Sequence, residues 1–214
     1  ADTPYGRLTP DVVLNAIDSA GLVTDGHQLA LNSYENRVFQ VGLEGGSFVV
    51  AKFYRPGRWS DVQILEEHAF ATELAASEIP VAAPWPLTID MASRHADRVT
   101  PIGTTLAQID TPLGAYRFSV GARLAGRAPE LEDAGTLEWN GRFIGRIHAI
   151  GALKPFEFRV TLSPKTFGTD NRDWLLGQNL IPPDAEPAWR QITQDALDAV
   201  AEAFGRNGAP RALR

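Results

Sequence analysis

Cysteine is absent from the 214 residues of this chain. Its absence excludes disulfide bonds, thiolate nucleophiles and cysteine-ligated zinc sites. It also fits a reducing compartment, and we expect the protein to be cytoplasmic. Long apolar runs are missing as well, since none approaches the roughly 18 residues that a membrane helix requires. We therefore expect no membrane partner.

An excess of basic residues is likewise missing. The 20 Lys and Arg residues are outnumbered by 26 Asp and Glu residues, which gives a net charge of −6 and a pI near 5.2. This balance argues against a nucleic-acid partner, because binding to a phosphate backbone depends on clustered positive charge. What the chain does have is 44% hydrophobic residues, enough for a packed core, and a length that suits one large domain or two small ones.

Residues 48–54 are predicted to form a strand with a single lysine in its middle. With a period of two, such a strand turns Phe48, Val50, Lys52 and Tyr54 to the same side. Burying an ammonium group without a partner is costly. Lys52 is therefore either a lysine whose charge reaches solvent or a lysine held in a cleft for an anion such as phosphate, and the strand alone does not distinguish the two.

Hydrophobic periodicity and turn residues predict an α+β fold, in which a small antiparallel sheet with a crossover helix is followed by a helical part. Five strands are expected near residues 28–32, 37–43, 48–54, 104–109 and 115–120. Helices are expected near residues 9–21, 61–77, 132–150, 171–179 and 187–204. Between the elements, residues 91–101 are predicted to be an exposed hairpin or loop, and residues 121–129 a linker.

The helix that follows the third strand offers Lys52 a partner. Ser60 and Gln63 have the spacing of a capping box, which places the start of this helix. Glu67 then lies on the apolar stripe of the helix, whereas Glu66 points elsewhere. A carboxylate on such a stripe requires a cation, and Lys52 is the obvious candidate.

Three features together are typical of a kinase nucleotide site: the strand lysine, the helical glutamate, and a polar turn at residues 33–36 whose backbone N–H groups could cover phosphates. Val38 and Val50 could cover an adenine ring from neighbouring strands. Each feature alone is common. The turn has no glycine, and Ser33 is also an ordinary turn-stabilising residue, so a phosphate contact and a structural role both remain open for it.

Five segments of the sequence carry a longer pattern. They are Asn32-Ser33-Tyr34-Glu35-Asn36-Arg37-Val38, Val50-Ala51-Lys52-Phe53-Tyr54-Arg55-Pro56, Gln63-Ile64-Leu65-Glu66-Glu67-His68, Pro80-Val81-Ala82-Ala83-Pro84 and Gly145-Arg146-Ile147-His148. In these segments the chain resembles the bacterial stress response kinase A, or RdoA-type, family. The resemblance implies a cytoplasmic Ser/Thr protein kinase of the stress response, with the protein kinase-like fold of aminoglycoside phosphotransferases.

The resemblance also implies roles for individual residues. Ser33 would contact the nucleotide from the phosphate loop, and Lys52 would bind phosphate with Glu67 as its partner, Glu66 being the alternative. Residues 119–123 would form the hinge beside the adenine. His148 belongs to a family motif, but we expect a buried histidine bonded to backbone there rather than a catalytic one.

By the same resemblance, residues 1–120 form the nucleotide-binding lobe, residues 121–129 the hinge or linker, and residues 130–214 the start of a helical lobe. The family's His-Gly-Asp loop, the asparagine five residues after it and a later metal-binding aspartate have no counterpart in this sequence. The resemblance therefore implies ATP and Mg²⁺ as cofactors, with the catalytic aspartate and the metal ligands beyond Arg214. We expect the 214-residue chain alone to transfer no phosphate, because phosphoryl transfer depends on the metal and on a base that orients the hydroxyl.

Three functions stay open at this point. The chain is part of a protein kinase whose protein substrate is unknown, of a phosphotransferase for a small alcohol such as an aminoglycoside or choline, or of a nucleotide-binding module without catalysis. A shared fold does not discriminate between them.

Overall fold

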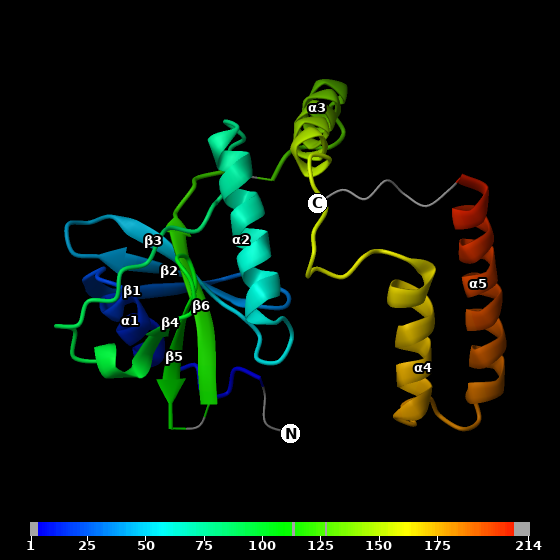
Figure 1. Ribbon diagram of the computed structural model, residues 1–214, viewed down its shortest axis with the longest axis horizontal. Coiled ribbons are helices and arrows are strands. Elements are labelled where there is room, and N and C mark those ends of the chain that lie inside the picture. Colours follow the sequence, from blue (N-terminus) through cyan, green and yellow to red (C-terminus); the bar gives the residue numbers. More distant parts are fainter. Residues whose placement is uncertain (1–3, 113, 127, 208–214) are drawn as a thin grey trace. The chain divides into compact units, whose positions relative to one another are not determined.

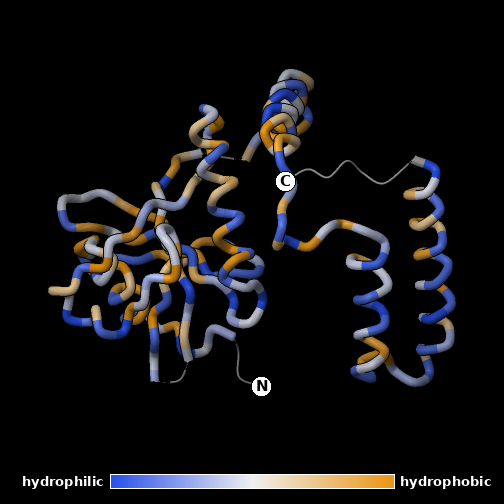
Figure 2. The backbone as a smooth tube through the Cα atoms, in the orientation of Figure 1, coloured by the Kyte–Doolittle hydropathy of each residue, from blue (hydrophilic) through white to orange (hydrophobic). Residues whose placement is uncertain are grey.

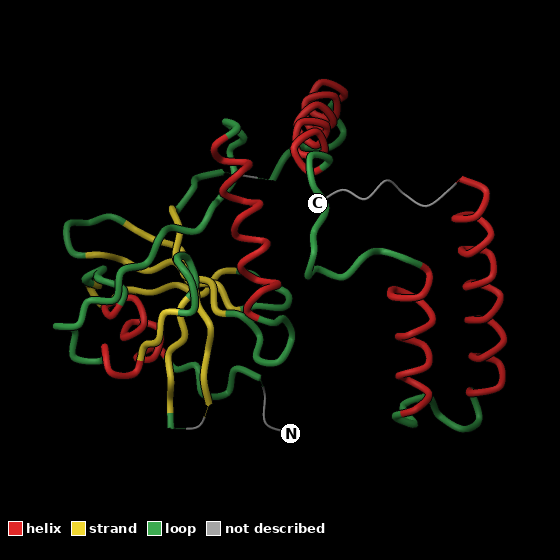
Figure 3. Tube along the Cα trace, in the orientation of Figure 1, coloured by secondary structure: helices red, strands yellow, loops and turns green. Residues whose placement is uncertain are grey.

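A six-stranded antiparallel sheet is the main element of the computed structural model, with strand order β1-β2-β3-β6-β5-β4 (Figures 1 and 3). The strands are β1 (Thr24–Leu31), β2 (Arg37–Leu43), β3 (Phe48–Phe53), β4 (Val99–Pro101), β5 (Ala107–Thr111) and β6 (Gly114–Ala122). The structure describes residues 4–112, 114–126 and 128–207. The chain divides after Gly151 into two units, and the sheet belongs to the first.

The antiparallel sheet predicted from the sequence is confirmed, but it has one strand more than the five expected. The additional strand, β4, lies within residues 91–101, for which the sequence predicts an exposed hairpin or loop. A short 3₁₀ turn, η1 (Ala96–Arg98), leads into it, and Val99 is buried and pairs with Ile109. A strand of three residues is too short to show a period of two, which is why the sequence pattern misses it.

The hairpin between β2 and β3 sets the register that the site depends on. Gly45 and Gly46 both have positive φ, at 93° and 82°, and the backbone N–H of Leu43 donates to the carbonyl of Ser47 at 2.9 Å. Glycine adopts such angles without a steric penalty, so the two strands can turn tightly. The resulting pairing places Val38 opposite Lys52.

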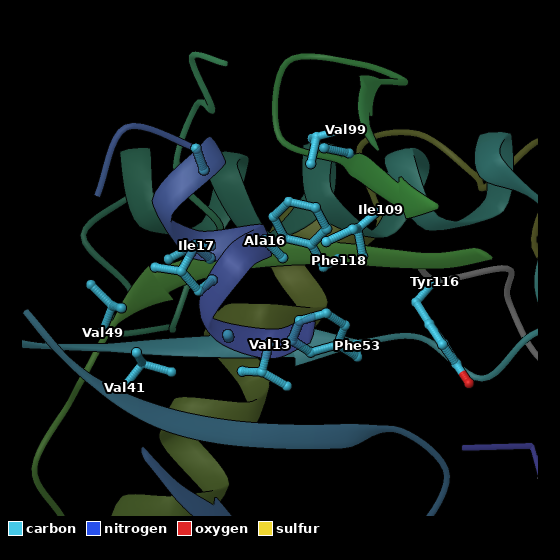
Figure 4. Packing of buried hydrophobic residues seen from close by; sticks show 14 residues of the cluster. Val13, Ala16, Ile17, Val41, Val49, Phe53, Val99, Ile109, Tyr116 and Phe118 are labelled. Atoms are coloured by element: carbon cyan, nitrogen blue, oxygen red, sulfur yellow. The ribbon is translucent and has the colours of Figure 1, made fainter. Parts of the chain in front are cut away.

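One face of the sheet is covered by α1 (Pro10–Ser19). Thr9 caps this helix, since its hydroxyl accepts a hydrogen bond from the backbone N–H of Val12. The residues of the joint core come from the helix and from alternate strand positions, and Figure 4 labels Val13, Ala16, Ile17, Val41, Val49, Phe53 and Phe118 among them. Each fully buried large apolar side chain contributes about 1.5–3 kcal/mol, so this face is the main source of stability in the unit.

The opposite face of β3 is met by α2 (Asp61–Ala76) (Figure 1). The predicted capping box is present, because the Ser60 hydroxyl accepts from the Gln63 backbone and the Gln63 side chain accepts from the Ser60 backbone. An ion pair between Arg117 of β6 and Asp61 fastens the first turn to the sheet. Buried Ile64 packs in a small cluster on this side of the sheet. The helix is thereby fixed in both position and rotation.

The last helix of the first unit is α3 (Ala134–Gly151). The carboxylate of Asp133 accepts a hydrogen bond from the backbone N–H of Thr136 at 2.7 Å, which caps the helix start. Arg146 donates to the carbonyls of Ser77 and Glu78 at the end of α2. His148 is exposed, so the expectation of a buried histidine at this position is wrong.

The second unit consists of helices. A π-helical turn, η2 (Lys165–Thr169), continues into α4 (Asp170–Gly177), and α5 (Glu186–Asn207) follows. Hydrophobic and hydrophilic residues are interspersed along α4 and α5 (Figure 2). Within the described residues, no helix combines the length and the apolar character needed to cross a membrane. The assignment of the lobes to residues 1–120, 121–129 and 130–214 stays a prediction, and the boundary between the units lies further along, after Gly151.

Candidate functional site

A cleft of about 160 Å³ opens on the face of the sheet that α2 covers. Its floor is built by the register of three strands, because Lys52 of β3 pairs with Val38 on one side and with Ser119 on the other. The lining residues are Val38, Val50, Lys52, Tyr54, Glu67, His68, Ala71, Ala82, Pro84 and residues 119–122. The cleft therefore has mostly apolar walls and one cation. Its volume is below the roughly 300–1,000 Å³ of a complete small-molecule pocket, so it fits part of a nucleotide-sized ligand.

The cation of the cleft is paired with a carboxylate of α2. The Nζ atom of Lys52 lies 3.0 Å from Oε1 of Glu67, and their side chains are 31% and 39% exposed. The ammonium also lies 4.7 Å from the centroid of the Tyr54 ring, within the range of a cation–π interaction. The pairing predicted from the sequence is thus present, and it is made by Glu67 and not by Glu66.

The environment of Lys52 keeps its charge. Burial by itself lowers the pKa of Lys52, but the interactions with Tyr54 and Glu67 outweigh it, and the net pKa is raised. Burial raises the pKa of Tyr54 above its ordinary value, so the phenol is neutral near pH 7 and Glu67 supplies the opposing charge there. A charged ammonium group that stays partly exposed in an apolar cleft can attract an anionic group.

Behind Lys52, four side chains form a buried chain of hydrogen bonds. The Tyr54 hydroxyl lies 2.6 Å from Nε2 of His68 and 3.2 Å from the Ser119 hydroxyl, and Nδ1 of His68 lies 2.7 Å from the Thr105 hydroxyl. Tyr54, His68 and Ser119 are all buried. This chain ties the end of β3 to β6, to α2 and to the segment before β5. It therefore fixes the helix on which Glu67 stands.

His68 is uncharged in this network. Its pKa is lowered to about 4, chiefly by burial; Glu67 acts in the opposite direction, and Lys52 adds a smaller lowering effect. A neutral imidazole has one donor and one acceptor, which suits a position between two hydroxyl groups. A charged ring here would lose solvation without gaining a carboxylate partner of its own.

The outer wall of the cleft is formed by a segment that runs beside β6. Pro84 makes an isolated antiparallel bridge with Gly121, and the backbone N–H of Trp85 donates to the carbonyl of Val120 at 2.8 Å. A Cβ atom on Gly121 would lie 3.2 Å from the carbonyl oxygen of Ala83. A contact this short is tighter than most Cβ contacts, so a larger residue at this position would force the two segments apart by a few tenths of an ångström. The stretch predicted as a hinge at residues 119–123 is an extension of β6 as far as Ala122.

The other predicted site residues divide into two groups. Val38 and Val50 line the cleft beside Lys52. Ser33 is not among the lining residues, and its hydroxyl donates to the carbonyl of Asn36 at 2.7 Å within the turn between β1 and β2. The structure thus displays the turn-stabilising role of Ser33, whereas a contact with a nucleotide stays a prediction.

No group of three or more His, Cys, Asp or Glu side chains in residues 4–112, 114–126 and 128–207 is arranged to hold a metal ion. We therefore assign no residue of the described part of the chain to Mg²⁺.

Sequence reasoning missed several residues of the site. Tyr54 was placed on the correct face but given no partner, and His68 and Thr105 were given no role. Their interaction joins residues 14 and 37 positions apart in the chain. The available signal was the spacing of His68, which lies four residues after Ile64 and so on the same buried face of the helix, a position where a polar ring must find hydrogen-bond partners.

The sequence matches a known protein family and several curated proteins. The family described as "Phosphotransferase enzyme family" matches residues 27–213. Serine/threonine protein kinase RdoA of Salmonella typhimurium is 34% identical over 200 residues, which are 94% of this chain and 56% of that protein. Stress response kinase A of Escherichia coli K12 is 34% identical over 196 residues, or 92% of this chain and 54% of that protein. The resemblance inferred from the motifs is confirmed, and the chain spans about half the length of these relatives.

Solved structures show the same fold. An amicoumacin kinase in complex with AMP-PNP and Ca²⁺ superposes with a TM-score of 0.56 and 20% identity, over 85% of this chain and 51% of that one. A microcompartment-associated aminopropanol kinase gives a TM-score of 0.55 and 17% identity, over 78% and 49% of the two chains. At these identities the similarity bears on the fold alone, and it confirms the predicted kinase-like fold.

Proposed function

Because the chain belongs to the phosphotransferase enzyme family, we propose that it binds ATP in the cleft beside Lys52 as part of a kinase that phosphorylates protein hydroxyls. The observation that carries the proposal is the Lys52–Glu67 pair, with 3.0 Å between Nζ and Oε1, at the end of a cleft walled by valines. A cation held by a carboxylate next to an apolar slot suits a ligand that joins a flat ring to phosphates.

In this proposal each lining residue has one task. Val38 and Val50 cover the adenine ring from β2 and β3, and Lys52 meets the α- and β-phosphates. Glu67 holds the ammonium in place before the nucleotide binds. A lysine side chain with four rotatable bonds would otherwise lose considerable conformational entropy on binding. The turn with Ser33 precedes Val38, which pairs with Lys52, so in this proposal it lies beside the phosphates. Mg²⁺ accompanies ATP in phosphoryl transfer, where it neutralises the developing charge on the phosphates.

The acceptor is proposed to be a Ser or Thr hydroxyl of a protein in a cytoplasmic stress response. Support comes from the 34% identity to a protein named as a serine/threonine protein kinase. The alternative is a small alcohol, as suggested by the names of the two kinases with similar folds, which are under 25% identical to this chain. A nucleotide-binding module without catalysis is the third possibility.

Binding of the non-hydrolysable analogue AMP-PNP to the intact protein tests the nucleotide site. Lys52→Ala is expected to weaken binding about tenfold or more, because a hydrogen bond to a charged group contributes about 1.5–3 kcal/mol. Lys165→Ala is the matched control, since Lys165 is an exposed lysine that is also paired with a carboxylate, that of Asp170 at 2.7 Å. It should bind as the wild type does. Equal affinity of Lys52→Ala and Lys165→Ala in isothermal titration calorimetry would contradict the proposal.

Radiolabelled ATP separates the acceptor classes. Transfer of label by the intact protein to serine- and threonine-containing proteins, lost in Lys52→Ala, would support the protein kinase. Transfer only to an amino alcohol or aminoglycoside would establish the small-molecule alternative. Nucleotide binding without transfer to either class would leave the binding module.

A further inference from the structure

The turn between β1 and β2 has a defined shape without help from glycine. It spans residues 32–36, and its sequence contains neither glycine nor proline. The only non-glycine residues with positive φ in the described part of the chain are Glu78 and Asn179, so every residue of the turn has negative φ. Its residues therefore have ordinary backbone angles, and several hydrogen bonds join the turn to neighbouring segments.

The most extensive of these contacts belong to Glu35. Its Oε2 accepts a hydrogen bond from Nε of Arg58 at 2.8 Å, and its Oε1 accepts one from Nε1 of Trp59 at 2.7 Å. The Glu35 side chain is 28% exposed, and the guanidinium of Arg58 lies 4.7 Å from the Trp59 ring. Both oxygens of one carboxylate thus bind the segment that follows β3, 23 and 24 residues further along the chain.

Two further hydrogen bonds fasten the turn at Glu35 and Asn36. The Tyr5 hydroxyl donates to the Glu35 carbonyl at 2.8 Å. The backbone N–H of Arg55 donates to the side-chain oxygen of Asn36 at 3.3 Å. Tyr34, by contrast, is fully exposed. The turn is therefore anchored at Glu35 and Asn36 by two other segments, while its neighbouring residue Tyr34 faces solvent.

The anchored turn leads directly into the wall of the cleft. Val38 follows it by two residues, lines the cleft and pairs with Lys52 across the strands. A turn that already has its bound shape loses less conformational entropy when a ligand binds. Fixing the turn should accordingly matter most for the part of a ligand that lies beside it.

We propose that Glu35 is a positioning residue, which with Arg58 and Trp59 presets the backbone of the β1–β2 turn for the phosphate groups of ATP. The inference rests on the proposed nucleotide site and adds to it a cause for the shape of a glycine-free phosphate turn. It makes a selective prediction: loss of Glu35 should weaken ligands that carry phosphates and leave ligands without phosphates unaffected.

The test compares AMP-PNP with adenosine, which shares the base and the sugar but has no phosphates. For the intact protein carrying Glu35→Ala, we expect AMP-PNP affinity to fall about tenfold and adenosine affinity to change less than about twofold in calorimetric competition. Glu44→Ala is the matched control, because Glu44 is an exposed glutamate in the turn at the other end of β2. It should leave both affinities unchanged.

A second variant keeps the test decisive if Glu35→Ala does not fold. Trp59→Phe retains an aromatic ring and removes only the Nε1–H donor, and it should lower AMP-PNP affinity about threefold relative to adenosine. An equal loss for both ligands, or no loss for either, would overturn the role of Glu35. If Lys52→Ala also leaves AMP-PNP binding intact, the nucleotide site itself fails; if Lys52→Ala weakens binding and Glu35→Ala does not, only the positioning role fails.

Discussion

Acidification should destabilise the first unit through one buried histidine. His68 is 3% exposed, and both of its ring nitrogens lie within hydrogen-bond distance of hydroxyl groups, at 2.6 Å from Tyr54 and 2.7 Å from Thr105. Burial lowers its pKa in the folded protein to about 4. In the unfolded chain the same imidazole should have the ordinary pKa near 6.5.

The sign and size of the effect follow from proton linkage. Between the two pKa values the unfolded state binds one more proton than the folded state, so protonation favours unfolding. The stabilising contribution is complete above about pH 6.5 and is lost as the pH falls toward about 4. Each pH unit in that window costs about 1.4 kcal/mol, which amounts to about 2 kcal/mol between pH 6.5 and pH 5 and about 3 kcal/mol by pH 4.

Urea denaturation at several pH values measures this contribution. The free energy of unfolding of the wild type should fall along this slope, whereas His68→Gln should be less stable at neutral pH but lose less stability on acidification. Because carboxylates also titrate at the acidic end, the difference between the two proteins is the decisive quantity. His148→Gln, which removes an exposed histidine from α3, serves as the control and should retain the wild-type slope. Identical slopes for wild type and His68→Gln would refute the assignment of a neutral, buried imidazole.

Three further predictions concern the same unit. Tyr54→Phe should lower the free energy of unfolding by about 1–3 kcal/mol in urea titration, because it removes one hydrogen bond from each of two buried partners, His68 and Ser119. Tyr34→Phe at a fully exposed position should change it by less than about 0.5 kcal/mol, and equal effects of the two substitutions would argue against the network. Ser60→Ala should lower the free energy of unfolding by about 1 kcal/mol, because it removes the capping box of α2. A thermal unfolding midpoint equal to that of the wild type would contradict this prediction. Gly121→Val should narrow the cleft and weaken AMP-PNP binding. Gly145→Ala in α3 should bind normally, because a Cβ added there meets nothing within 4 Å. Undiminished binding by Gly121→Val would show that the ligand lies elsewhere.

The local part of the fold was accessible from the sequence. The capping box of Ser60 and Gln63 placed the start of α2 correctly, and the strands expected at residues 37–43 and 48–54 agree with β2 and β3 to within one residue. These signals lie within a few residues of the element they specify, so they do not depend on the rest of the chain. The strand β4 was missed because its three residues are too few to show the alternating pattern of a strand.

The candidate site was predictable in part. Alternation along β3 put Lys52 on one face with Val50, and periodicity along α2 favoured Glu67 over Glu66 as its partner. Ser33 could not be decided in this way, because a hydroxyl in a turn satisfies either a carbonyl group or a ligand, and the structure displays the bond to Asn36.

By itself, then, the sequence determined which residues face the same side of each strand and helix, and with its motifs it determined the family. Only the tertiary structure decided which of these faces meet. The Tyr54 hydroxyl reaches Ser119 across 65 residues of chain, the Glu35 carboxylate binds Arg58 and Trp59, and Ala83 closes on Gly121. The physical reason is that periodicity fixes directions within one element, whereas hydrogen bonds between elements depend on the register and packing of the whole unit.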